Sequence, residues 1–181
     1  MKKVFITNGS GMSGKDSFVK AISKYIPTSK YSSIDLVKNM LEVAGIQKEP
    51  KTEEKRLLYS DMKDRLTKYD DIPFKDIASI VADFKNNKIE TKVLFIDIRE
   101  PNEIARAVKT FGAETILIRN PRVEKIASNH ADANVENYEY DYIIENNGTI
   151  EQLDKMAYLF VCDVIRNKLI KYPFTFVCNK Y

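Results

Sequence analysis

The sequence is poor in the residues that build disulfide and metal frameworks. It contains two cysteines, Cys162 and Cys178, and a single histidine, His130. Two thiols cannot form a disulfide framework or a four-ligand zinc site, so both are expected to be core or near-surface thiols. Long apolar runs are also absent, because the longest, 156–162, has seven residues, whereas a bilayer-spanning helix needs ~20. We therefore expect no membrane partner.

The sequence also has little excess charge of either sign. The 29 lysines and arginines stand against 26 aspartates and glutamates, a net charge of +3, which is too small to indicate a nucleic-acid partner. Six glycines and six prolines leave no room for a low-complexity linker. The chain begins Met-Lys-Lys and continues into a strand-like segment, unlike a signal peptide. A length of 181 residues with 44% apolar content is typical of one globular domain, so we expect a single cytoplasmic domain over 1–181.

What the sequence does contain is an alternation of short apolar runs with segments of helical periodicity. This alternation is typical of a parallel sheet covered by helices. Residues 149–152 match a capping box at the start of the last helix. Residues 174–177 are either an added edge strand or a docking segment. The expected strands are 3–7, 30–32, 93–97, 115–118 and 141–145, and helical stripes cover 14–25, 34–44, 58–66, 77–84, 104–111 and 149–171.

The most informative segment follows the first expected strand. Residues 9–17 match the pattern Gly-x-x-x-x-Gly-Lys between a strand and a helix, which is the context that this pattern requires. Backbone N–H groups of such a loop surround a phosphate, the helix N-terminus adds partial positive charge, and the lysine reaches the outer phosphates. The alternative is a glycine-rich turn with a solvated lysine. The candidate phosphate-binding residues are Gly9, Ser10, Gly11, Met12, Ser13, Gly14, Lys15, Asp16 and Ser17.

One position departs from the common pattern. Asp16 stands where a serine or threonine hydroxyl normally ligates magnesium. A carboxylate is also a hard oxygen ligand, so Asp16 stays a candidate Mg²⁺ ligand, whereas Ser17 lies ~100° further around the helix. The segment Ser13-Gly14-Lys15-Asp16 resembles the loop of two groups of small P-loop kinases, the phage-type deoxynucleoside monophosphate kinases and the animal-type phosphomevalonate kinases. Both groups carry aspartate after the lysine.

The resemblance, together with the alternation of strands and helices, implies a P-loop fold. This fold is an α/β three-layer sandwich around a mainly parallel five-stranded sheet of order 2-3-1-4-5, with a helical acceptor-binding insertion and a lid. Residues 93–97 have the form of a Walker B strand, four apolar residues and an acid. Such a strand lies beside the first one, so we expect Asp97 within about 10 Å of Lys15. There it would face Mg²⁺, usually through water.

The residues that follow this strand extend the resemblance. Residues 97–103 are similar to the Asp-Val-Arg-Phe-Pro-Asn-Glu stretch of the deoxynucleotide kinases, with Glu100 in place of the aromatic residue. Arg99 comes just past the carboxyl end of a central strand, where ligands bind in open α/β sheets. We expect Arg99 to bind the acceptor phosphate. The alternative is a helix-capping arginine paired with Glu103.

Further arginines end the next expected strand. We interpret about 119–138 as a lid in which Arg119, and secondarily Arg122, binds phosphoryl oxygens and spreads the charge of the transition state. The alternative is a pair of solvated arginines. His130 and Asp132 are weaker candidates for a direct role, because phosphoryl transfer depends mainly on positioning and charge.

Residues 141–149 resemble a strand-and-turn segment that both kinase groups share. In that fold the turn lies near the adenine, which implies that Asn147 and Gly148 contact the base. The resemblance is clear over 3–24 and 92–155 and faint between them. The acceptor therefore falls in the part of the chain where the resemblance says least.

The acceptor is expected to bind to a helical region over about 31–88. Tyr31, Asp35 and Lys38 follow the second strand, where such kinases open their acceptor pocket. Arg65 offers positive charge to a monophosphate, although a charged helical region is usually just a solvated face. The neighbouring basic residues of the same region are Lys55, Arg56 and Lys63.

The function that these patterns favour is an ATP-dependent kinase that transfers the γ-phosphoryl group to a (deoxy)nucleoside monophosphate. Lys15, Asp97, Arg99, Arg119 and Arg122 are the candidate catalytic residues, and Asp97 and Asp16 are the candidate Mg²⁺ ligands. Two alternatives stay open: a kinase for another small phosphomonoester such as phosphomevalonate, and a non-catalytic ATP-binding protein. The expected partners are ATP and the phosphorylated acceptor, and a homodimer is left open.

Overall fold

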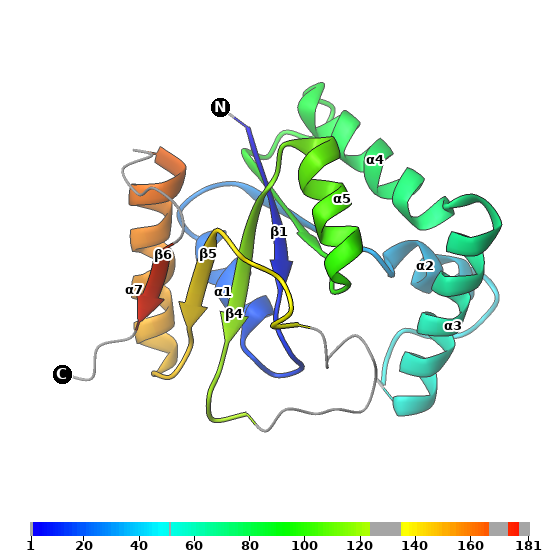
Figure 1. Cartoon of the computed structure of the whole chain (residues 1–181), viewed down its shortest axis with the longest axis horizontal. Helices are drawn as coiled ribbons and strands as arrows, with labels where there is room; N and C mark the ends of the chain where they lie inside the picture. The colour runs from blue at the N-terminus through cyan, green and yellow to red at the C-terminus, as the bar shows by residue number, and fades with distance from the viewer. Residues whose placement is uncertain (1, 51, 124–134, 167–173, 178–181) are drawn as a thin grey trace. The chain divides into compact units, whose positions relative to one another are not determined.

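The computed structural model describes residues 2–50, 52–123, 135–166 and 174–177 and contains a six-stranded sheet (Figure 1). The strand order is β2-β3-β1-β4-β5-β6. The predicted order of the first five strands is confirmed, and the predicted strand count is one short. The strands are β1 (Lys3–Asn8), β2 (Thr28–Ser32), β3 (Val93–Asp97), β4 (Glu114–Arg119), β5 (Tyr142–Glu145) and β6 (Phe174–Val177).

The additional strand is the segment for which the sequence left two interpretations open. β6 pairs parallel with β5, with Phe176 opposite Ile144. The Phe176 side chain is buried, and its ring lies 5.7 Å from that of Phe160. Burial of this aromatic side chain in the shared core stabilises an edge strand that local pattern alone does not specify.

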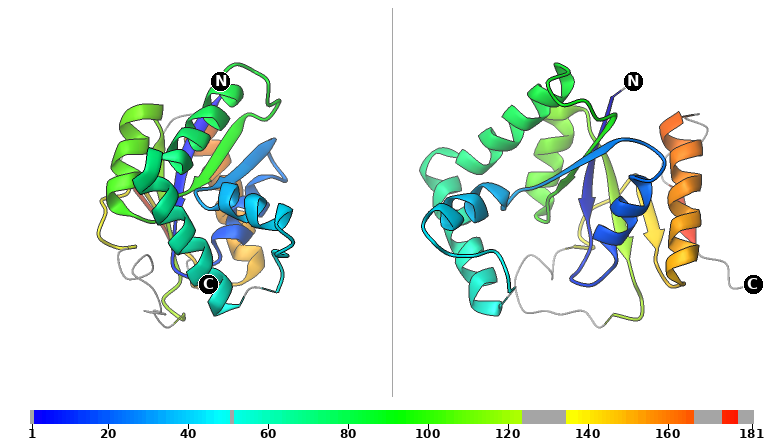
Figure 2. Two further views of the ribbon diagram at one scale, coloured as in Figure 1. Left: turned by 90° about the vertical axis from the view of Figure 1, so that its right-hand side faces the viewer. Right: turned by 180° about the vertical axis from the view of Figure 1, so that it is seen from behind.

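Two helical layers cover the sheet. The helices α1 (Lys15–Ile22) and α7 (Ile150–Phe160) lie side by side on one face, and α5 (Pro101–Phe111) lies on the other (Figures 1 and 2). Because both faces are covered, β1 and β3 are buried along their whole length, as expected for central parallel strands.

Aromatic rings fill the core beneath α1 and α7. Phe5 of β1 stacks on Phe95 of β3 with 5.6 Å between ring centroids. Phe160 of α7 meets the edges of Phe5, Phe18 and Tyr142 at 5.2–5.7 Å. These contacts fix α1, and therefore the loop that precedes it, against the carboxyl end of β1.

The ends of two helices differ from the sequence prediction. The helix predicted over 14–25 begins at Lys15 and ends at Ile22. The capping box at the start of α7 is confirmed, because the Thr149 hydroxyl accepts from Gln152 N at 3.3 Å and Thr149 N donates to the Gln152 side chain at 2.8 Å. The last helix does not continue as one α-helix to 171. Val161–Arg166 form a π-helical segment, η1, and 167–171 lie outside the described residues.

The chain divides into two compact units, Met1–Lys30 with Glu90–Tyr181, and Tyr31–Ile89. The second unit is helical and contains α2 (Asp35–Val43), α3 (Glu53–Asp70) and α4 (Ile72–Lys85). Val37, Leu41 and Tyr59 form its small buried core. None of the helices in the described part of the chain combines the length and apolarity that a bilayer crossing needs.

Candidate active site

The glycine-rich loop between β1 and α1 lies too close to its neighbours for side chains at two positions. A Cβ added to Gly9 would lie 2.6 Å from the carbonyl oxygen of Ile118, on β4. Gly14, the residue before α1, has a φ of +91°, and a Cβ there would lie 2.2 Å from Asn146 Nδ2. The backbone carbonyl beside Gly9 leaves no room for a side chain, and the left-handed backbone at Gly14 favours glycine. By contrast, Met12 is 80% exposed.

Asn146 braces this loop from the end of β5. Its side-chain Nδ2 donates to the carbonyl oxygen of Ser13 at 2.9 Å, and its backbone N donates to the carbonyl oxygen of Arg119 at 2.7 Å. It therefore joins the glycine-rich loop to the carboxyl ends of β4 and β5. Sequence reasoning selected the two residues that follow Asn146 and missed Asn146 itself.

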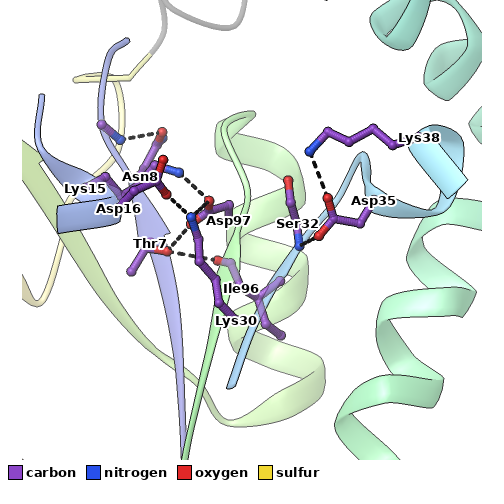
Figure 3. Close-up of polar contacts among 11 residues, drawn as sticks. Thr7, Asn8, Lys15, Asp16, Lys30, Ser32, Asp35, Lys38, Ile96 and Asp97 are labelled. Atoms are coloured by element: carbon purple, nitrogen blue, oxygen red, sulfur yellow. Dashed lines mark hydrogen bonds and ion pairs between the residues drawn. The ribbon is translucent and has the colours of Figure 1, made fainter. Parts of the chain in front are cut away.

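Four charged side chains meet at the start of α1 (Figure 3). The Lys15 ammonium forms an ion pair with Asp97 Oδ2. The Lys30 ammonium lies 2.9 Å from the same oxygen and also pairs with the Asp16 carboxylate. Thr7, which faces Asp97 across the β1–β3 register, donates its hydroxyl to Asp97 Oδ1 at 2.5 Å. The structure thus brings together Lys15, Asp16 and Asp97, and adds Lys30, which sequence reasoning did not single out.

Burial and charge act differently on the two lysines. Burial lowers the pKa of Lys15 below its ordinary value of 10.5, and the adjacent Asp97 carboxylate opposes this shift without cancelling it. Burial also acts to lower the pKa of Lys30, but the carboxylates of Asp97 and Asp16 outweigh it, so the pKa of Lys30 is raised. Two ammonium groups and two carboxylates leave the cluster formally neutral.

Asn8, the last residue of β1, holds the surrounding segments together. Its Oδ1 accepts from Gly9 N at 2.8 Å, and its Nδ2 donates to the carbonyl oxygen of Arg99 at 3.1 Å and to the Tyr140 hydroxyl at 2.7 Å. The Tyr140 hydroxyl in turn donates to the carbonyl oxygen of Val135 at 2.8 Å. Burial raises the pKa of Tyr140 to about 12. Asn8 thus connects the glycine-rich loop, the residues after β3 and the 135–140 segment.

The three predicted arginines have different surroundings. Arg99 is half-buried just beyond β3, at the carboxyl edge of the sheet. Arg119 ends β4 and faces Glu145 across the β4–β5 register. Its Nε donates to Glu145 Oε1 at 3.0 Å, and this hydrogen bond raises the pKa of Arg119. Arg122 is exposed.

Of the region predicted to form a lid, the structure describes 119–123 and 135–138. His130 and Asp132 lie outside the described residues. The lid therefore stays a prediction, as do the phosphoryl contacts of Arg119 and Arg122.

Apart from Arg99, the residues predicted to bind the acceptor lie in the second unit, where several have structural partners. The Tyr31 hydroxyl donates to the Asp76 carboxylate, and burial, followed by this bond, raises the pKa of Tyr31. The Asp35 carboxylate accepts from Ser32 N at 2.8 Å and pairs with Lys38 at 2.8 Å. Arg65 is exposed on α3.

Lys55, which was considered for the same role, contacts the backbone of the segment that precedes its own helix, α3. Its Nζ donates to the carbonyl oxygens of Glu49 and Pro50 at 3.2 and 3.1 Å. In this structure the ammonium therefore serves backbone acceptors in the second unit.

The donor set at the start of α1 is compatible with Mg²⁺. Asp16 and Asp97 supply hard carboxylate oxygens, and a single ammonium contacts both, so one cation can lie between them. Among the residues that the structure describes, no group of three or more His, Cys, Asp or Glu side chains could hold a metal ion. Mg²⁺ would therefore need phosphate oxygens and water as its other ligands, which is its usual coordination.

Comparison with known proteins identifies the fold. No family model and no curated protein sequence matches the chain. An unliganded sugar kinase from Janibacter sp. HTCC2649 superposes with a TM-score of 0.51 at 12% identity, covering 90% of this chain and 95% of that chain. Shikimate kinase from Aquifex aeolicus superposes with a TM-score of 0.47 at 14% identity, covering 91% of this chain and 99% of that one. The chain shares its α/β fold with the sugar kinase. The finer resemblance to deoxynucleoside monophosphate or phosphomevalonate kinases stays a prediction.

Proposed function

We propose that this protein is an ATP-dependent kinase whose acceptor is a (deoxy)nucleoside monophosphate. The observation that carries the proposal is the contact between Lys15, which begins α1 after the glycine-rich loop, and Asp97, which ends the neighbouring strand β3. A phosphate loop, an amine beside it and an acid on the adjacent strand are the groups that P-loop phosphotransferases use.

On the donor side, the backbone N–H groups of 9–14 and the N-terminus of α1 would bind the phosphates of ATP. The Lys15 ammonium would leave Asp97 and bind the outer phosphates instead. There it would neutralise the charge that develops during transfer. Mg²⁺ supplies further neutralising charge when it is bound with ATP, and Asp16 and Asp97 are the residues that would hold it. Asn147 Oδ1 is buried and has no hydrogen-bond partner in the described part of the chain, so it offers an acceptor for an amino group of the base.

On the acceptor side, Arg99 is the residue we propose to bind the monophosphate. It follows the strand that carries Asp97, and a guanidinium binds two phosphoryl oxygens at once. In the transfer, an acceptor phosphate oxygen attacks the γ-phosphorus. The bond from the γ-phosphorus to the β–γ bridging oxygen breaks, and its electron pair leaves with ADP. Arg119 and Arg122 would spread the transition-state charge, and Tyr31, Asp35, Lys38 and Arg65 would contact the rest of the acceptor.

Turnover of a substrate panel tests this proposal. The common deoxynucleoside and nucleoside monophosphates, with phosphomevalonate as a further acceptor, are mixed with ATP and Mg²⁺, and ADP release is measured. Wild type should turn over at least one nucleoside monophosphate, and Lys15→Ala should lose that activity. Lys24→Ala is the matched control, because Lys24 pairs with Asp154 at 2.6 Å, away from the phosphate loop.

The panel also separates the alternatives. If phosphomevalonate were the only acceptor turned over, the proposal of a nucleotide acceptor would be wrong, and the proposal of kinase activity would stand. ATP binding without turnover of any acceptor would contradict the kinase proposal and favour a non-catalytic ATP-binding protein.

A further inference from the structure

Lys30 lies in the charge cluster without an assigned function. It stands on β2, which lies beside β3 in the sheet, and its side chain is 32% exposed. Its ammonium contacts the carboxylates of Asp16 and Asp97, the two residues that would hold Mg²⁺ (Figure 3). The lysine therefore occupies the position between the two carboxylates that a shared divalent cation would need.

The charges of the cluster explain how Lys30 affects the binding of a divalent cation. Lys15 and Lys30 balance the two carboxylates, so a divalent cation that enters alone must displace an ammonium and leave it beside two positive charges. A triphosphate that enters with the cation offers the lysines new anionic partners and leaves the carboxylates to the metal. Metal binding and nucleotide binding are then coupled, and each raises the affinity for the other.

We propose that Lys30 is the internal counter-ion of the metal site, and that it makes divalent-cation binding depend on bound nucleotide. The proposal rests on the metal and nucleotide sites of the proposed function, and it is independent of which acceptor is phosphorylated. In the nucleotide-free protein Lys30 excludes the cation from Asp16 and Asp97. When nucleotide and cation enter together, Lys30 leaves the carboxylates.

Manganese binding to the nucleotide-free protein tests this. Free Mn²⁺ is measured by its electron paramagnetic resonance signal during titration of wild type and variants, because Mn²⁺ prefers the same oxygen ligands as Mg²⁺. Lys30→Met keeps an unbranched side chain and removes the charge, so it should bind Mn²⁺ about 5- to 150-fold more tightly than wild type, the usual range of a coupling between two sites. Lys30→Arg keeps the charge and should behave like wild type.

Two matched variants locate the effect. Lys24→Met removes one charge from another lysine–aspartate pair and should leave Mn²⁺ affinity unchanged. Lys30→Met combined with Asp16→Asn should lose the affinity gained by Lys30→Met. An unchanged Mn²⁺ affinity in folded Lys30→Met, or an equal gain in Lys24→Met, would overturn the proposal.

A measurement on wild type keeps the proposal testable if Lys30→Met does not fold. A non-hydrolysable ATP analogue should raise the affinity of wild type for Mn²⁺ beyond what the analogue binds in free solution, and equal affinity with and without it would overturn the proposal. These outcomes need no acceptor. Coupled Mn²⁺ binding in a protein that phosphorylates nothing would therefore refute the proposed function alone.

Discussion

A side chain at position 14 is predicted to destabilise the protein, and the structure separates two reasons for this. The φ of Gly14, +91°, lies in the left-handed region, which costs an L-residue roughly 1–2 kcal/mol. A Cβ there would lie 2.2 Å from Asn146 Nδ2, so the amide must move and lose its 2.9 Å bond to Ser13 O. Such a bond is worth about 0.5–1.5 kcal/mol. Gly14→Ala should therefore lower the free energy of unfolding by about 1.5–3.5 kcal/mol.

Two further variants separate strain from contact. Asn146→Ala removes the same hydrogen bond and should cost about 0.5–1.5 kcal/mol. In Gly14→Ala combined with Asn146→Ala the bond is already lost, so the double variant should be no less stable than Gly14→Ala alone. Gly112→Ala is the control for strain, because Gly112 has a φ of +63° and no atom within 4 Å of an added Cβ.

The assay is urea unfolding followed by far-ultraviolet circular dichroism, with linear extrapolation to water. The deficit from additivity in the double variant measures the contact between Gly14 and Asn146. If the double variant lost the full sum of the single losses, the two residues would not be coupled. A loss in Gly14→Ala no larger than in Gly112→Ala would likewise refute the reasoning.

Three other predictions follow from the site. Lys15→Ala should reduce turnover by about 100-fold or more with the fold retained, because it removes a charge that the transition state needs, and unaltered turnover would count against the assignment. Arg99→Ala should raise the KM for the monophosphate about 10- to 150-fold and that for ATP little. Arg99→Lys should recover only part of this, and a loss of ATP affinity instead would place Arg99 in the donor site. The pKa of Tyr140, raised from 10.0 to about 12, implies stability that is fully present below pH 10 and is lost as the pH rises to about 12. At about 1.36 kcal/mol per pKa unit, the unfolding free energy of wild type should fall over that interval by roughly 2–3 kcal/mol more than that of Tyr140→Phe, which has no hydroxyl to titrate. Equal falls in the two proteins would refute this contribution.

The alternation of strands and helices and three of the four charged residues of the cluster were predictable because their signals are local. Residues 9–15 form one continuous pattern, and Asp97 ends a continuous apolar run. Parallel strands bring their carboxyl ends to one edge of a sheet, so the contact between Lys15 and Asp97 follows once those two strands are neighbours. The sixth strand was left open because four residues carry too little pattern to distinguish an edge strand from a docking segment.

The sequence by itself therefore determined the glycine-rich loop between a strand and a helix, the order of the first five strands and the acid beside the loop. Only the tertiary structure decided the partners of these groups. Lys30 belongs to a weakly patterned strand, and its approach to Asp16 and Asp97 depends on where β2 joins the sheet. Asn146 follows β5 by a single residue, yet its side chain contacts Ser13, 133 positions away in the chain. Side-chain partners of this kind depend on long-range register and on which strand ends converge, and neither is encoded in the spacing of nearby residues.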